Sequence, residues 1–298
     1  MAKQSIVAAL KTGRILVSDG AWGTFLQKKG MVPGECPELW CVTHRDAVMD
    51  IAKSYIDAGS DMIETDSFGG TRCKLEHFGL ASRTEELNKA AASISRAAAG
   101  PDKWVIASVG PTGMMTAMGD VTEAEFYAYF KEQAMALEAG GADAICIETM
   151  SALDESVAAI RAARENTGCE VICTLTYERT LQGTYRTMMG VSPSEAARAT
   201  VEAGAHIIGT NCGNGMERML EIVKELKLAA PTTPIMAQAN AGLPKNINGV
   251  DVFPESPADM AARVPELVAA GAVIIGGCCG TTPAHISALK QAVNQLKR

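Results

Sequence analysis

The stretch Ala270-Gly271-Ala272-Val273-Ile274-Ile275-Gly276-Gly277-Cys278-Cys279 combines an Ala-Gly pair, a short apolar run and two adjacent cysteines. A glycine directly after a helix adopts the left-handed conformation without a Cβ penalty, so Gly271 predicts the end of a helix. The apolar run that follows predicts a buried strand. Because a helix that leads into a buried strand is typical of βα units around a parallel sheet, this stretch predicts an α/β fold.

The same order of elements recurs along the chain, with further Ala-Gly pairs at Gly59, Gly140 and Gly204. Helical periodicity predicts helices that include residues 46–57, 123–138, 192–202 and 257–269. Eight apolar runs predict strands at residues 15–17, 62–63, 104–109, 144–147, 171–175, 206–208, 234–237 and 272–275. Eight βα units suit a (β/α)8 TIM barrel, a fold that reaches about 250 residues or more as one domain. We therefore expect a single barrel domain over residues 1–298.

The composition argues against several classes of protein. The net charge of −7 disfavours a nucleic-acid partner, and no apolar run approaches the roughly 18 residues of a membrane span. The N-terminus lacks the apolar segment of a secretory signal. Nine cysteines are an odd number without the spacing of a disulfide framework. We therefore expect reduced thiols, a cytoplasmic location, and neither nucleic acid nor a membrane as partner.

Polar residues follow each predicted strand, and in a (β/α)8 barrel these strand ends form one rim that holds the active site. Cys278 and Cys279 end the eighth predicted strand, and Cys212 ends the sixth. A disulfide between adjacent residues would be strained, because disulfides usually join Cα atoms about 4.4–6.8 Å apart. Three thiolates can instead bind Zn²⁺ and leave its fourth position open, as in catalytic sites. The alternative is that all three are ordinary core cysteines.

The open position on such a zinc ion suits a substrate thiol, which is mostly protonated at neutral pH when free and loses its proton on zinc. Asn211, beside Cys212, has two possible roles here. Its side-chain oxygen could fill the fourth position before substrate arrives, or its amide could orient the Cys212 loop.

Other rim residues are candidates for binding the substrate. The turn that begins at Asp19 exposes backbone N–H groups that could hold a carboxylate, while the Asp19 side chain receives an ammonium group. Glu148 is a second candidate for the ammonium, or a structural hydrogen-bond acceptor. The carboxylates at positions 64 and 66 could hold substrate or brace their loop. The candidates for substrate contact are Asp19, Gly20, Ala21, Glu64, Asp66 and Glu148.

Taken together, these motifs resemble the homocysteine S-methyltransferase family, and the details look closest to the N-terminal homocysteine module of cobalamin-dependent methionine synthase. The resemblance implies a TIM barrel in which Cys212, Cys278 and Cys279 bind Zn²⁺, and the zinc binds homocysteine sulfur. It also implies that Asp19, Glu148 and backbone groups near Gly20 and Ala21 hold the amino-acid end of homocysteine. The motifs are Asp19-Gly20-Ala21-Trp22-Gly23-Thr24, Glu64-Thr65-Asp66-Ser67-Phe68-Gly69, Glu148-Thr149, Gly209-Thr210-Asn211-Cys212 and Gly276-Gly277-Cys278-Cys279-Gly280-Thr281-Thr282-Pro283.

The resemblance leaves the methyl donor open. The chain has no room for folate- or cobalamin-binding domains, so we expect the donor to be a separate methylated corrinoid protein or a small compound such as S-methylmethionine or a betaine-like molecule. Trp22, Asp66 and Ala239 depart from the residues that the family usually has at these positions. Two alternatives therefore remain: a corrinoid-linked methyltransferase that acts on another thiol or a methylated metabolite, and a zinc-binding barrel without catalysis.

Overall fold

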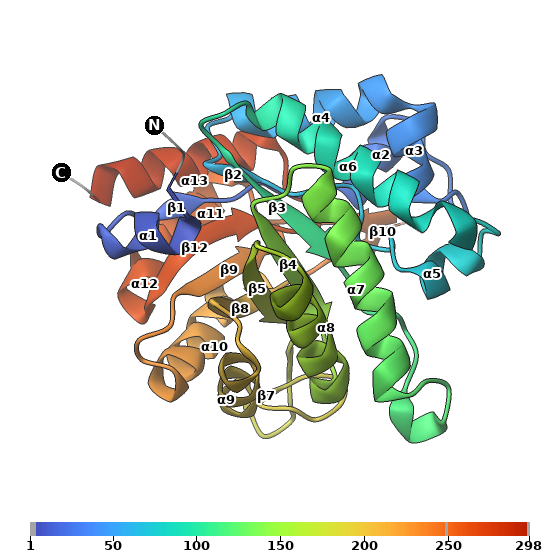
Figure 1. Cartoon of the computed structure of the whole chain (residues 1–298). Coiled ribbons are helices and arrows are strands. Elements are labelled where there is room, and N and C mark those ends of the chain that lie inside the picture. Colours follow the sequence, from blue (N-terminus) through green and yellow to red (C-terminus); the bar gives the residue numbers. More distant parts are fainter. Residues whose placement is uncertain (1–3, 248–249, 297–298) are drawn as a thin grey trace.

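The computed structural model describes residues 4–247 and 250–296. Eight parallel strands form one sheet in the order β1-β12-β9-β8-β5-β4-β3-β2, with helices packed around it (Figure 1). The predicted (β/α)8 TIM barrel is thereby confirmed, and each of the eight apolar runs contributes one strand. The strands are β1 (Leu16–Val17), β2 (Met62–Ile63), β3 (Trp104–Val109), β4 (Ala144–Met150), β5 (Glu170–Leu175), β8 (Ile207–Asn211), β9 (Ile235–Ala239) and β12 (Ala272–Gly277).

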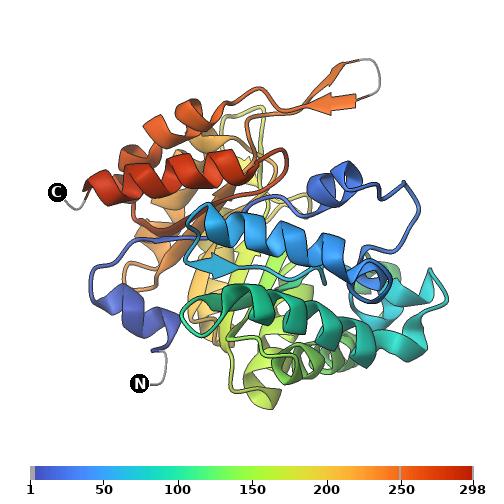
Figure 2. The same cartoon turned by 90° about the horizontal axis from the view of Figure 1, so that it is seen from above.

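The helices lie between the strands, and two short hairpins extend the loops that follow β5 and β9. Figure 2 shows the second hairpin, in orange, standing out from the barrel. The hairpins are β6 (Glu178–Arg179) with β7 (Tyr185–Arg186), and β10 (Lys245–Ile247) with β11 (Val250–Val252). The helices are α1 (Ile6–Lys11), α2 (Gly23–Lys28), α3 (Pro37–Thr43), α4 (Arg45–Asp57), α5 (Arg72–Glu76), α6 (Thr84–Ala99), α7 (Glu123–Ala139), α8 (Leu153–Asn166), α9 (Pro193–Ala203), α10 (Met216–Ala229), α11 (Pro257–Ala262), α12 (Val264–Ala270) and α13 (Pro283–Leu296), with 3₁₀ turns η1 (Ala81–Arg83) and η2 (Thr116–Met118). Within the described ranges, no helix combines the length and the apolar character needed to cross a membrane.

Two details of the sequence prediction were wrong. The expected helix 257–269 is two helices, α11 and α12, that meet at Arg263. Pro265 explains the break, because proline has no N–H to donate and its ring clashes with the carbonyl of the residue four positions earlier. At the end of α7 it is Gly141, with φ of +103°, that adopts the left-handed conformation, whereas Gly140 remains right-handed. A Cβ at Gly140 would lie 2.6 Å from the Cβ of Ala92, so this glycine serves close packing against α6.

A recurring hydrogen bond holds neighbouring strands in register. Asp61, directly before β2, donates its N–H to Val17 O (2.7 Å) and accepts from Val17 N on its Oδ2 (2.9 Å), which joins the two ends of the strand order and closes the barrel. The Asp61 carboxylate also pairs with Lys290 at 2.6 Å. Asp143, before β4, accepts from Val105 N at 2.7 Å in the same way. Each of these aspartates stands two residues after a left-handed glycine.

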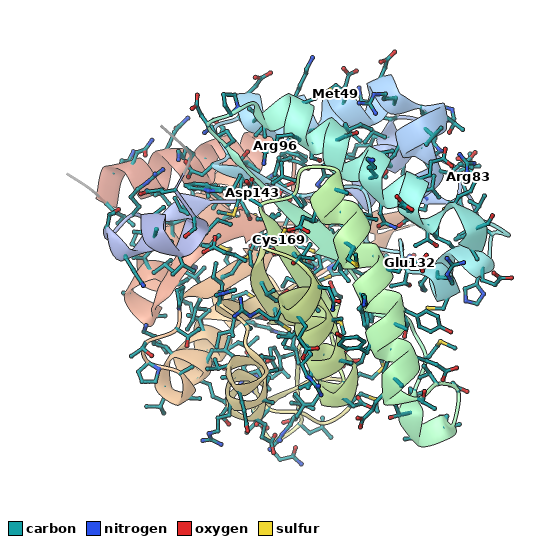
Figure 3. The ribbon with its side chains drawn as sticks, in the orientation of Figure 1. Met49, Arg83, Arg96, Glu132, Asp143 and Cys169 are labelled. Atoms are coloured by element: carbon teal, nitrogen blue, oxygen red, sulfur yellow. The ribbon has the colours of Figure 1, made fainter. Side chains whose placement is uncertain are left out.

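The same kind of hydrogen bond, from a backbone N–H of one strand to a side chain just before the next, occurs at one further strand. His206, before β8, accepts from Val171 N on Nδ1 at 2.8 Å, and it too follows a left-handed glycine by two residues. The residue two positions after the left-handed Gly271 is Val273, which lies within β12 and has no side-chain acceptor. Arg96 of α6 reaches over to pair with Asp143, and the two side chains lie together in Figure 3.

The N-terminal end of the barrel is closed by α1. Ile6, Ala9 and Leu10 of this helix pack against inward-facing strand residues such as Trp104. The first N–H groups of α1 donate to the carboxylate of Glu170, at 2.6 Å from Ile6 and 3.0 Å from Val7. Because this end is plugged by apolar side chains, the interior can open to solvent only at the carboxyl ends of the strands.

Candidate active site

Three cysteines meet at the carboxyl-end rim of the barrel. The sulfur atoms of Cys212, Cys278 and Cys279 all lie within 4.8 Å of one another, and those of Cys212 and Cys279 are 3.8 Å apart. Cys212 follows β8 in the left-handed region, with φ of +59°. Its N–H donates to Gln238 O at 3.0 Å, and the N–H of Cys278 donates to Ala239 O at 2.7 Å. Two consecutive residues of β9 therefore fix both cysteine loops.

The sulfur positions fit a tetrahedral metal ion. Zn–S bonds of about 2.3 Å at tetrahedral angles place two sulfurs roughly 3.8 Å apart, which is the separation of Cys212 and Cys279. Hydrogen bonds from the Cys278 and Cys279 thiols lower the pKa of Cys212 to about 3. Within the described ranges, no other group of cysteine, histidine and acidic side chains comes together in this way. The cluster could therefore hold a metal.

The cysteines form one wall of a cavity of about 500 Å³. Three aromatic side chains, Trp22, Phe68 and Phe78, also line it, and Phe68 is 41% exposed at the mouth. Four carboxyl groups face the same space, those of Glu38, Glu64, Asp66 and Glu148. The cavity thus combines a soft metal-binding cluster, apolar walls and an excess of buried acids, which suits a positively charged or zwitterionic thiol compound.

Glu148 lines the cavity and is linked to the cysteine cluster through Asn211, the residue before Cys212. Its Oε1 accepts a hydrogen bond from Ser108 Oγ, and its Oε2 accepts from Asn211 Nδ2 at 3.0 Å. Burial raises the pKa of Glu148 to about 7. Its carboxyl group is therefore held in one orientation by two neutral donors, with no cation bonded to it among the described residues.

Asn211 has both sides of its amide occupied by the fold. Its Oδ1 accepts from Thr149 N and from Thr174 Oγ1, each at 2.8 Å. Its Nδ2 donates to Glu148 Oε2 and to Thr149 Oγ1. An asparagine side chain offers two donors and two acceptor positions, so no position remains for a metal. This arrangement favours the role of orienting the loop over the role of fourth zinc ligand.

Asp19 and Glu64 form a second acidic layer, held together by a shared oxygen. Asp19 Oδ2 accepts from Trp22 Nε1 at 2.8 Å and from Glu64 N at 2.9 Å. Glu64 Oε1 accepts from Gln238 Nε2 at 2.8 Å, and burial together with the charge of Glu148 raises the pKa of Glu64. Asp19 is fully buried behind the wall that Trp22 and Glu64 form, and burial raises its pKa to about 7.

Comparison with known proteins identifies the family to which the chain belongs. The sequence model of homocysteine S-methyltransferases matches residues 16–293. The chain belongs to the homocysteine S-methyltransferase family. It is 33% identical to a methionine synthase of Mycobacterium tuberculosis (strain ATCC 25618 / H37Rv) over 96% of this chain, and 32% identical to one of Mycobacterium leprae (strain TN) over 94%. It spans about a quarter of the length of these two relatives, 25% and 24% respectively.

Solved structures agree on the fold. The metallated form of the homocysteine methyltransferase MmuM from Escherichia coli superposes with a TM-score of 0.77 at 24% identity, covering 95% of this chain and 98% of that one. Its apo form gives a TM-score of 0.74 at 22% identity, with coverage of 96% and 98%.

Three other candidate substrate-binding residues, Asp66, Ala21 and Gly20, already contact other parts of the protein. Asp66 lines the cavity, and its Oδ2 lies 3.7 Å from the Cys41 thiol; burial and nearby Glu38 raise its pKa. The N–H of Ala21 donates to Thr281 Oγ1 at 3.1 Å, so the fold itself uses this donor. Gly20 is needed for close approach, since a Cβ there would lie 2.5 Å from the same Thr281 oxygen.

Sequence reasoning did not assign roles to Ser108, Gln238 or Glu38. The expected rim already includes Gln238, directly after the predicted strand 234–237, and Ser108 lies near the end of the predicted strand 104–109, so the same rule could have found it. Glu38 belongs to α3, and its Oε1 accepts from Gly69 N at 2.6 Å. Nothing in the pattern of the chain signals that this helix reaches the cavity.

Proposed function

We propose that this chain transfers a methyl group to the thiol of homocysteine and so forms methionine, with Zn²⁺ held by Cys212, Cys278 and Cys279. The observation that carries the proposal is the cluster of three sulfur atoms within 4.8 Å at the wall of an acid-lined cavity. Membership of the homocysteine S-methyltransferase family and the similarity to methionine synthases support the reaction class and the acceptor.

In this proposal, different groups bind the two ends of the acceptor: the metal binds the sulfur, and acidic side chains bind the ammonium group. When bound, Zn²⁺ would supply a Lewis acid that keeps the acceptor sulfur ionised at neutral pH. Glu148, Glu64 and the free oxygen of Asp19 would receive the ammonium group, while Asp66 and the backbone near Gly20 and Ala21 complete the binding surface. A methyl group then passes from the donor to the acceptor sulfur, and the donor's leaving group keeps the bonding electron pair. Holding sulfur and methyl carbon about 3–3.5 Å apart in line is the main task of the rim.

The size of the cavity bears on the donor. A volume of about 500 Å³ exceeds what one small amino acid fills, so the methyl-bearing end of a second molecule has room beside the acceptor. We propose either a separate methylated corrinoid protein or a small donor, S-methylmethionine or a betaine-like compound. Transfer to another thiol, or between methylated metabolites, is the second candidate, because Trp22 and Asp66 shape the acceptor side of the cavity.

The test is a mass-spectrometric assay for methionine. The zinc-loaded protein receives homocysteine with methylcobalamin, S-methylmethionine, betaine or cell extract, and we expect methionine with at least one of them. Cys278→Ala should lose both metal and activity, whereas Cys73→Ala, a half-buried cysteine of α5, should keep both. Full metal occupancy in Cys278→Ala would refute the ligand assignment. Absence of methionine with every donor, together with no homocysteine binding by calorimetry, would favour the second candidate.

A further inference from the structure

Trp22 occupies an unusual place between the cavity and the buried carboxylate of Asp19. Its ring lines the cavity and is only 9% exposed. Its indole Nε1 points back into the protein and donates to Asp19 Oδ2 at 2.8 Å. The side chain therefore has a ligand-facing surface and a hydrogen bond that reaches the layer behind it.

The two carboxylate oxygens of Asp19 differ in their number of hydrogen bonds. Oδ2 accepts two donors, Trp22 Nε1 and the N–H of Glu64. Oδ1 is buried and finds no hydrogen-bond partner among the described residues. Burying a carboxylate is costly unless it is paired and hydrogen-bonded, so Oδ1 keeps the capacity to accept a donor that a ligand brings.

Two donors on one oxygen also fix the orientation of the carboxylate. The Glu64 amide is part of the backbone after β2 and cannot follow a rotating side chain. The indole N–H supplies the second fixed point, at the cavity side of Asp19. Without it, a single hydrogen bond would leave the carboxylate free to turn about its χ2 torsion, which is broad for aspartate.

We propose that Trp22 is a positioning residue for the acceptor: its indole N–H holds the Asp19 carboxylate so that Oδ1 is left for the ammonium group, and its ring forms the wall past which that group must reach. This inference rests on the proposed function, and it assigns to Trp22 a role in selecting acceptors that carry a free amino group. Phenylalanine at this position keeps an aromatic wall but cannot hold Asp19.

The experiment measures binding of two thiols to the zinc-loaded protein by calorimetry. One is homocysteine, and the other is its des-amino analogue, which keeps the thiol and the carboxylate. We expect Trp22→Phe to weaken homocysteine binding roughly tenfold or more, the usual worth of a hydrogen bond to a charged group, with little change for the des-amino analogue. In an Asp19→Asn background, adding Trp22→Phe should change neither affinity further. Metal content should equal that of the unmodified protein.

Trp104→Phe is the matched control, because Trp104 also donates its indole N–H, to Gln4 O at 3.0 Å, but at the plugged end of the barrel. This control should bind both thiols as the unmodified protein does. If Trp22→Phe does not fold, Trp22→Met, which equally lacks the donor, replaces it.

The outcomes are separable. An unmodified protein that prefers homocysteine, with the preference lost in Trp22→Phe, supports the inference. A preference that survives in Trp22→Phe overturns the role of Trp22 and leaves the proposed function intact. An unmodified protein that binds neither thiol overturns the proposed function, and this inference with it.

Discussion

Replacing Asn211 by alanine tests whether this residue braces the rim or binds the metal. The substitution removes four hydrogen bonds that join three strand ends: two to Thr149, one to Thr174 and one to Glu148. At about 1 kcal/mol net for each bond, the free energy of unfolding should fall by ~4 kcal/mol. The buried partners left without a bond make this a lower bound, since each orphaned group costs its own desolvation.

The assay is urea unfolding of the metal-free protein, with the midpoint shifted and the slope unchanged. Asn166→Ala is the control of the same residue type, since Asn166 makes two hydrogen bonds from the half-buried end of α8. It should lose less than half as much stability. A loss below about 1 kcal/mol in Asn211→Ala would refute the bracing role.

A second measurement separates the two roles directly. Metal that binds only the folded state raises the free energy of unfolding by an amount set by its affinity. If Asn211 only braces the loop, the stabilisation gained on adding zinc should be similar in Asn211→Ala and in the unmodified protein. A clearly smaller gain in the variant would assign Asn211 to the metal after all.

Three further predictions concern closure, pH and metal. Asp61→Asn should lower the free energy of unfolding by about 2 kcal/mol in urea, because it breaks a largely buried ion pair, whereas Asp50→Asn at an exposed pair should change it by about 0.5 kcal/mol or less. Burial raises the pKa of Asp19 and of Glu148 to about 7, so the metal-free folded chain keeps protons that the unfolded chain releases. The stability that these two protonated groups contribute is therefore fully present below about pH 4 and is lost as the pH rises toward 7. The difference in free energy of unfolding between the unmodified protein and Glu148→Gln should fall over that range, and a rise would contradict the burial argument. Chelation should lower the melting temperature of the unmodified protein but not that of Cys278→Ala, as calorimetry can show.

The strands and the rim were predictable because both depend on local patterns. Short apolar runs that end in polar residues identify parallel strands, and every strand end lies on the same edge of the barrel. The Ala-Gly pairs predict where a helix ends, but they do not always predict which glycine adopts the left-handed conformation. Both Gly140 and Gly141 could adopt the left-handed conformation, and only the contact of Gly140 with Ala92 on α6 decides between them. That contact joins residues far apart in the chain, so no local pattern contains it.

The roles of individual rim residues were harder to predict for a similar reason. Asn211 and Asp19 both carry side chains that could face a ligand, yet every donor named here except Trp22 comes from a distant part of the chain. Thr149 and Thr174 occupy the amide oxygen of Asn211 from β4 and β5. Trp22 and the Glu64 amide occupy one oxygen of Asp19. Which lone pairs remain free depends on the register of neighbouring strands, and the sequence pattern does not contain this information.

The metal cluster shows how strand order can replace spacing along the chain. Cys212 and Cys278 follow β8 and β12, which β9 separates, so their strand axes are roughly 10 Å apart. The sulfurs of Cys212 and Cys279 nevertheless come within 3.8 Å, because both loops turn inward over the end of β9. The left-handed conformation of Cys212 makes this turn possible, and hydrogen bonds to Gln238 and Ala239 hold it. A search for ligands at fixed sequence spacing would miss this site, whereas following the strand ends around the barrel finds it.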